Sequence, residues 1–356
     1  MQPLHDVWPK VIAFENLWLA WRKARRGKSR SGGTVAFELD LERNLLDLQR
    51  ELKDGDYHTG AYRLFTIYER KPRLIAAAPF RDRVVHHALM NIIEPPLDRH
   101  FIFDSYACRR GKGVHAAVNR YQLWAQRYTY AMKLDVRRYF PSIDHANLKD
   151  MLCLRIDDAE VLNLLNQIID CGPKIQPEKL VYFPGDNLFT PLERPCGIPI
   201  GNLTSQFFAN VYLDGFDHRI KEELGVRAYL RYVDDMVLLA DSKVSLYAWR
   251  DWVVERLGDL RLRIHSDKAK VCQVNEGLEL LGYRIFPRNR RLHNENGLRF
   301  RRRLRSFAKG YAKGQLNWPE INSSVQAWIG HACHADTLSL RRKLFSSISF
   351  QRERTK

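Results

Sequence analysis

The sequence of 356 residues lacks the features that mark secreted, membrane-spanning or zinc-stabilised proteins. Its six cysteines include no CxxC pair, so the sequence signals neither a disulfide framework nor a structural zinc site. No segment approaches the roughly 20 consecutive apolar residues that a membrane-spanning helix needs. The N-terminus, MQPLHDVWPKVIAFENLW, has neither the basic start nor the apolar core of a secretory signal. We therefore expect a soluble cytoplasmic protein without a membrane partner.

Positive charge is abundant. Lys and Arg total 58 against 41 Asp and Glu, which leaves a net charge of +17. An excess of this size indicates a polyanionic partner, and nucleic acid is the first candidate. The segment RFRRRLR (299–305) concentrates five arginines and lies in a basic stretch, 288–356, that we interpret as a separate helical module. The plain alternative for these arginines is a solvated helix face.

Hydrophobic periodicity predicts alternating helices and strands. We expect helices over 14–26, 41–55, 81–97, 202–224 and 249–260. We expect a strand pair over 62–75, a hairpin over 228–240, and strands over 130–143 and 278–286. Pro95-Pro96 is expected to end the third helix, and Pro141 to turn the strand over 130–143. The alternation indicates an α+β or α/β protein whose sheet carries acidic residues.

The stretch RYVDDMVLLAD (231–241) places Asp234 and Asp235 between two apolar runs, where a hairpin would turn. Two adjacent carboxylates repel each other unless they are solvated or share a cation. The pair therefore indicates either a solvated turn or a divalent-metal site.

A second acidic strand favours the metal site. In MKLDVRRYFPSI, Asp135 follows an apolar run at the end of a predicted strand. Asp135, Asp234 and Asp235 would bring carboxylates from neighbouring strands to one point, as hard cations such as Mg²⁺ require. Two such ions can clamp the attacking 3′-oxygen and the leaving pyrophosphate of an in-line phosphoryl transfer. A purely structural aspartate at 135 is the alternative.

Four segments, in this order, resemble the motifs of reverse transcriptases. LDVRRYF (134–140) resembles their first catalytic strand, and GIPIGNLTSQ (197–206) their template- and nucleotide-contacting loop. YVDD (232–235) resembles their catalytic hairpin, and LLGY (280–283) their primer-grip turn.

The resemblance implies an α+β right-hand polymerase fold. An N-terminal extension and fingers would occupy 1–130, the palm 131–287 and a helical thumb 288–356, with an irregular insertion at 172–199. Two Mg²⁺ ions, or Mn²⁺ in their place, would be held by Asp135, Val136, Asp234 and Asp235.

The same resemblance implies further site residues. Arg73 and Arg81 fall where the fingers hold the incoming triphosphate, and guanidinium groups suit phosphate oxygens. Surface salt bridges are the alternative. Phe140 would lie under the sugar and favour dNTPs over NTPs, although Tyr139 could be confused with it. Lys268, weighed against Lys270 and against a solvated lysine, would protonate the leaving pyrophosphate.

The stretch IGNLTSQ (200–206) supplies the substrate contacts Ile200, Gly201 and Gln206, and its pattern resembles the diversity-generating retroelement branch. That branch implies cDNA synthesis from template RNA with errors at adenines, and a small basic accessory protein as partner. The other partners implied are the RNA/DNA duplex and dNTPs. Competing interpretations are a retron-like or phage-defence reverse transcriptase, an RNA-dependent RNA polymerase, and a non-catalytic RNA-binding scaffold.

Overall fold

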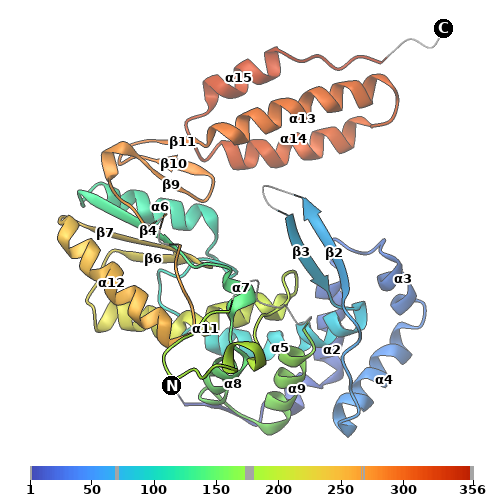
Figure 1. Cartoon of the computed structure of the whole chain (residues 1–356). Helices are drawn as coiled ribbons and strands as arrows, with labels where there is room; N and C mark the ends of the chain where they lie inside the picture. Colours follow the sequence, from blue (N-terminus) through green and yellow to red (C-terminus); the bar gives the residue numbers. More distant parts are fainter. Residues whose placement is uncertain (1, 69–71, 173–179, 266, 268, 353–356) are drawn as a thin grey trace. The chain divides into compact units, whose positions relative to one another are not determined.

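The computed structural model describes residues 2–68, 72–172, 180–265, 267 and 269–352 (Figure 1). The chain divides into two compact units. Unit 1 comprises 1–110, 134–236 and 248–269, and unit 2 comprises 111–133, 237–247 and 270–356. The three-part division into fingers, palm and thumb stays a prediction. Among the described residues, no helix combines the length and the apolar character that crossing a bilayer requires.

Unit 1 contains most of the helices, and α2 and α5 pack against each other in it. Its elements are β1 (Leu4–His5), α1 (Trp8–Val11), α2 (Phe14–Ala24), α3 (Gly32–Glu38), α4 (Leu41–Asp54), β2 (Arg63–Tyr68), β3 (Pro72–Ala77), α5 (Phe80–Asp98), α7 (Tyr139–Ser142), α8 (His145–Cys153), β5 (Ile156–Asp157), α9 (Ala159–Asp170), α10 (Thr190–Glu193), α11 (Leu203–Glu222) and β6 (Tyr229–Tyr232).

Unit 2 contains the C-terminal helices. Its elements are α6 (Val114–Ala125), β8 (Val271–Gln273), the 3₁₀ turn η2 (Val274–Glu276), β9 (Leu278–Leu280), β10 (Tyr283–Ile285), β11 (Arg290–Leu292), α13 (Asn294–Ala312), α14 (Trp318–Ala332) and α15 (Leu338–Ser346). Phe300, Leu304 and Leu344 form the buried centre of the helices α13 to α15. The basic C-terminal stretch is therefore helical, as predicted.

Residues of both units contribute to three further elements, β4 (Tyr130–Asp135), β7 (Asp235–Ala240) and α12 (Lys243–Asp259). The four-stranded sheet has the order β6-β7-β4-β8. The pair β2-β3 and the sheet β11-β10-β9 are antiparallel. Helices with antiparallel sheets confirm the predicted α+β class, whereas α/β is wrong.

Local sequence explains why α4 forms and ends where predicted. Leu45, Leu48 and Leu52 recur at helical spacing and are buried. Gly55 follows with φ of 79°, a left-handed conformation that suits glycine, and its N–H donates to the Glu51 carbonyl.

Two predicted boundaries are wrong. Helix α5 continues through Pro95 and Pro96 to Asp98, because the prolines lie near its end and Ile93 and Leu97 are buried around them. The strand predicted over 130–143 ends at Asp135, and the backbone turns at Arg138, whose φ is 50°, before Pro141, which lies inside α7.

The segment predicted as one strand over 278–286 is a hairpin of β9 and β10. Leu281 and Gly282 connect the strands with φ values of 50° and 90°. Positive φ at both central residues is the geometry of a type I′ hairpin turn, which reverses the chain within two residues.

Candidate active site

The acidic pair lies at the predicted hairpin. Strand β6 ends at Tyr232 and β7 begins at Asp235, so Val233 and Asp234 form a two-residue turn. Val233 has φ of 57°, an uncommon conformation for a β-branched residue that marks a strained position. Asp234 and Asp235 are both half-buried at this turn.

The end of β4 lies beside this turn, within unit 1. The Val136 N–H donates to the carbonyl of Asp234 at 3.2 Å. On its other side the same backbone pairs with residues 263–265, where the His265 N–H donates to the Asp135 carbonyl at 2.9 Å. In extended backbone the N–H and C=O of one residue point the same way, so the Val136 carbonyl also faces the hairpin. The structure therefore brings Asp135 and Asp234 to adjacent backbone positions.

The described residues include no group of three or more His, Cys, Asp or Glu side chains arranged to hold a metal ion. Mg²⁺ is commonly held by one or two carboxylates together with waters and substrate phosphates. The donor set at this turn, carboxylates and a backbone carbonyl, consists of the hard oxygen ligands that Mg²⁺ prefers. Coordination by Asp135, Val136, Asp234 and Asp235 stays a prediction.

The two aromatic candidates after β4 differ in burial. Tyr139 is 2% exposed, and its hydroxyl donates to the carbonyl of Ala209. Burial raises the pKa of the Tyr139 hydroxyl well above its usual value. Phe140 is half-buried, and its carbonyl accepts from the Ile198 N–H at 3.0 Å. Tyr139 is thus the core aromatic, which leaves Phe140 as the candidate for contact with a sugar.

The loop before α11 is attached to strand β3. The Ala76 N–H donates to the carbonyl of Ile200 at 3.1 Å. Gly201 has φ of 114°, and a Cβ there would lie 2.8 Å from Cγ2 of Ile75, so a larger residue would be strained and would clash. Gln206 is exposed in the first part of α11.

Asn202 was missed by sequence reasoning. Its side-chain amide donates to the Ala76 carbonyl at 3.0 Å and accepts from the Ala78 N–H at 3.3 Å. Asn202 is 4% exposed and immediately precedes α11. The sequence placed Asn202 inside the helix expected over 202–224, whereas it precedes α11 and its side chain joins the loop to the end of β3.

The predicted phosphate-binding residues lie in different surroundings. Arg73 is exposed on β3. Arg81 pairs with Glu51, and its guanidinium lies 5.1 Å from the centre of the Tyr57 ring. The salt bridge weighed as the alternative for Arg81 is therefore present. Lys268 lies outside the described residues.

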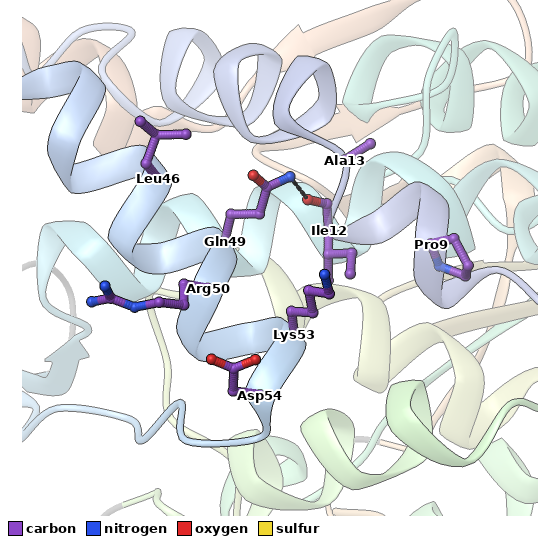
Figure 2. A pocket seen from close by; sticks show the side chains of 8 residues that line it. All are labelled: Pro9, Ile12, Ala13, Leu46, Gln49, Arg50, Lys53 and Asp54. Atoms are coloured by element: carbon purple, nitrogen blue, oxygen red, sulfur yellow. Dashed lines mark hydrogen bonds between the residues drawn. The ribbon is translucent and has the colours of Figure 1, made fainter.

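A separate pocket in unit 1 contains none of these residues. It measures about 520 Å³ and lies among residues of α1, the α1–α2 connection and α4 (Figure 2). Gln49 crosses it to donate to the Ile12 carbonyl at 2.8 Å, and Arg50, Lys53 and Asp54 surround its α4 side.

Comparisons with known proteins identify the family of this chain. The family model "Reverse transcriptase (RNA-dependent DNA polymerase)" matches residues 63–285, which is more than half of the chain and includes Asp135, Asp234 and Asp235. Protein YkfC of Escherichia coli is 27% identical over 288 residues, which cover 68% of this chain and 71% of that protein.

Two further matches are more distant. The group II intron-encoded protein LtrA of Lactococcus lactis is 24% identical over 179 residues, 49% of this chain but 28% of LtrA. The apo telomerase of Candida tropicalis matches with a TM-score of 0.47 and 11% identity, over 70% of this chain and 60% of that one. Because the family model matches well over half of the chain and spans the acidic hairpin, this chain belongs to the reverse transcriptase family.

Proposed function

We propose that this chain is an RNA-directed DNA polymerase that copies template RNA into cDNA at the acidic turn. The observation that carries the proposal is the backbone hydrogen bond from Val136 to Asp234, which brings the end of β4 to the hairpin. Family membership supports the reaction class. The net charge of +17 suits a nucleic-acid substrate.

In the proposed reaction, the primer 3′-oxygen attacks the α-phosphorus of a dNTP, and the bond to pyrophosphate breaks. Asp135, Asp234 and Asp235 would hold Mg²⁺, which when bound supplies positive charge to the attacking and leaving oxygens. Arg73 would hold the triphosphate, with Arg81 a second candidate once released from Glu51. Phe140 would exclude a 2′-hydroxyl from the sugar site. Lys268 would act as the general acid and donate a proton to the leaving pyrophosphate.

Primer extension tests the proposal. The purified chain is given a template RNA annealed to a DNA primer, with dNTPs and Mg²⁺. We expect cDNA that lengthens with time and stops on addition of EDTA. If the chain binds the primed template but does not extend the primer in Mg²⁺ or in Mn²⁺, the polymerase proposal is wrong and the non-catalytic scaffold is favoured. Preference for NTPs would favour the RNA polymerase.

We also propose that the chain belongs to the diversity-generating branch and misincorporates opposite template adenines. The support is Ile200, because reverse transcriptases of introns, retrons and viruses usually have a glutamine at this position of the motif. The aliphatic side chain lacks the amide that could hydrogen-bond the template or the nascent pair. Discrimination would then depend more on shape than on fixed contacts. The variant Ile200→Gln should lower misincorporation opposite adenine, whereas Ile200→Leu should keep it. Equal error rates in both variants would contradict this account.

We further propose that a small basic accessory protein is a partner of this chain, and that residues 288–356 form a thumb that holds the product duplex.

The DNA that flanks the gene distinguishes the diversity-generating role from the retron-like or phage-defence role. A near-repeat of a gene's 3′ end, differing where the template copy has adenine, would support the diversity-generating role. A structured RNA gene with a toxin or nuclease neighbour would instead favour a retron-like or phage-defence role.

A further inference from the structure

The strand that leads into the acidic turn contains a buried arginine. Arg231 is 0% exposed and is the largest of the fully buried side chains among the described residues. Its partner carboxylate, Asp217 of α11, is also 0% exposed. A buried charge is tolerated only when it is paired and hydrogen-bonded, so this pair must be held in a fixed geometry.

One side of the guanidinium is used entirely for that pairing. The Nε of Arg231 donates to both carboxylate oxygens of Asp217 at 2.9 and 2.8 Å, and Nη2 donates at 2.6 Å. The Tyr229 hydroxyl donates to the same carboxylate at 2.6 Å. The Asp217 carboxylate holds the pKa of Arg231 above its usual value although burial lowers it. The cation is therefore permanent.

The other side of the guanidinium reaches the turn. Its Nη1 donates to the carbonyl of Val233 at 3.0 Å and to Oδ1 of Asn210 at 3.3 Å. The backbone of Arg231 is itself fixed, because its N–H donates to the Asp104 carbonyl and its C=O accepts from the Tyr106 N–H, both at 3.0 Å. The guanidinium thus joins α11 and the turn through atoms that have little freedom to move.

The contacted carbonyl belongs to the peptide that links Val233 to Asp234. A peptide is planar, so fixing its carbonyl also fixes the direction in which the Asp234 backbone begins. The φ of 57° at Val233 is strained for a β-branched residue and persists only where the surroundings enforce it. A two-residue turn with positive φ at its first position normally has glycine there.

We propose that the buried Arg231–Asp217 pair is a positioning device for the polymerase centre, which holds the Val233–Asp234 peptide so that Asp234 is presented beside Asp135. The proposal rests on the proposed function of the acidic turn. It assigns Arg231 no contact with substrate. Its action is on the geometry of a metal-binding carboxylate.

The test replaces the pair by apolar residues, Arg231→Met with Asp217→Leu, because such replacement of a buried ion pair commonly preserves folding. A second, partly buried ion pair on the same helix supplies the control. Asp214 lies three residues before Asp217 on the same helix and pairs with Arg155 at 2.5 Å. The control variant is Arg155→Met with Asp214→Leu.

We expect the Arg231/Asp217 variant to lose kcat by about 10- to 100-fold, as for a reacting group misplaced by about 1 Å. Its half-saturating Mg²⁺ concentration should rise several-fold, whereas KM for the primed template stays unchanged. The Arg155/Asp214 variant should keep the wild-type Mg²⁺ dependence. A merely structural pair would lower stability without moving the Mg²⁺ requirement, so equal Mg²⁺ profiles in the two variants would overturn the proposal.

Arg231→Lys covers the case in which the double variant does not fold. A lysine ammonium can pair with Asp217 but lacks the second nitrogen that reaches Val233. We expect the same shift to higher Mg²⁺, and an unchanged Mg²⁺ profile would overturn the proposal. Absence of extension by the wild-type chain in the same assay would contradict the proposed function instead.

Discussion

The two adjacent aromatic residues after β4, Tyr139 and Phe140, have different roles. Tyr139 is anchored in the core by its bond to the Ala209 carbonyl, and this fixes the short helix that carries both rings. The Phe140 ring lies 5.8 Å from the Tyr139 ring in an edge-on arrangement. The buried ring thus sets the place of the half-buried one, which is the position that sugar discrimination would need.

Phe140→Ala should therefore weaken sugar discrimination. Removal of the ring leaves room for a 2′-hydroxyl, so the ratio of NTP to dNTP incorporation should rise by about 10-fold or more, the range expected when a steric contact of 1–3 kcal/mol is lost. Single-nucleotide extension with each substrate measures the ratio. Tyr139→Phe, which keeps the ring, should leave it unchanged. An unaltered ratio in Phe140→Ala would remove Phe140 from the sugar site.

Helix α11 is the element that connects the parts of the candidate site within unit 1. The loop that enters it is tied to β3 through Asn202, and Asp217 near its other end holds Arg231 under the acidic turn. Its length of 20 residues makes it a rigid spacer of about 30 Å. If substrate binding displaced the loop before α11, the displacement would therefore be transmitted through α11 to Asp217 and the acidic turn.

Helix α5 contains a buried histidine that predicts a pH dependence of stability. Burial, with smaller effects of His87 and Arg83, lowers the pKa of His86 to about 3. The unfolded chain takes up this proton near pH 6.5, before the folded chain does. Stability is therefore complete above about pH 6.5 and falls as pH decreases from 6.5 towards 3.

When the pH is lowered from 7 to 5, protonation of His86 in the unfolded chain should lower the free energy of unfolding by about 2 kcal/mol. His86→Leu should remove that part of the decline, whereas substitution of the exposed His58 by Ala should keep it. Denaturant titrations at the two pH values measure the difference. Parallel declines in wild type and His86→Leu would show that His86 does not titrate as inferred.

Sequence reasoning was most successful where the signal is local. Apolar spacing and Gly55 define α4, and an acidic pair between apolar strands defines the hairpin. Periodicity failed where tertiary packing overrides propensity, as at Pro95-Pro96, and it read 278–286 as one strand although the resemblance of LLGY (280–283) to a turn pointed to the observed hairpin. Asn202 and Arg231 could not be assigned because their partners are distant in sequence, although an arginine inside an apolar strand indicates a buried partner.

At the scale of the whole molecule, the expected α+β right-hand polymerase fold is confirmed by the strand pairings and by family membership. Helix α13 carries a dense run of positive charge, with five arginines in residues 299–305. Arg301, Arg302 and Arg305 of α13 are exposed. This arrangement suits contacts with the phosphates of a product duplex, which is recognised through its backbone and its shape.

The triple variant Arg301→Gln, Arg302→Gln and Arg305→Gln should bind an RNA/DNA hybrid with a shallower salt dependence. The slope of log Kd against log salt should fall by about 2, since each lost phosphate contact removes about 0.7 to 0.9. Arg43→Gln with Arg50→Gln serves as control, because these α4 arginines pair with Asp47. Identical slopes in the two variants would rule out α13 as a duplex contact.

The central claim is that the carboxylates of 135, 234 and 235 act together on one reaction. Its most direct test is Mg²⁺-dependent primer extension by Asp135→Asn, Asp234→Asn and Asp235→Asn, with Asp241→Asn as a control beyond the end of β7. We predict that each of the first three variants extends the primer at least about 100-fold more slowly than wild type and keeps its affinity for the primed template. The reason is that bound Mg²⁺ stabilises the negative charge of the transition state by several kcal/mol. Near-wild-type extension by Asp135→Asn, Asp234→Asn or Asp235→Asn would contradict the account.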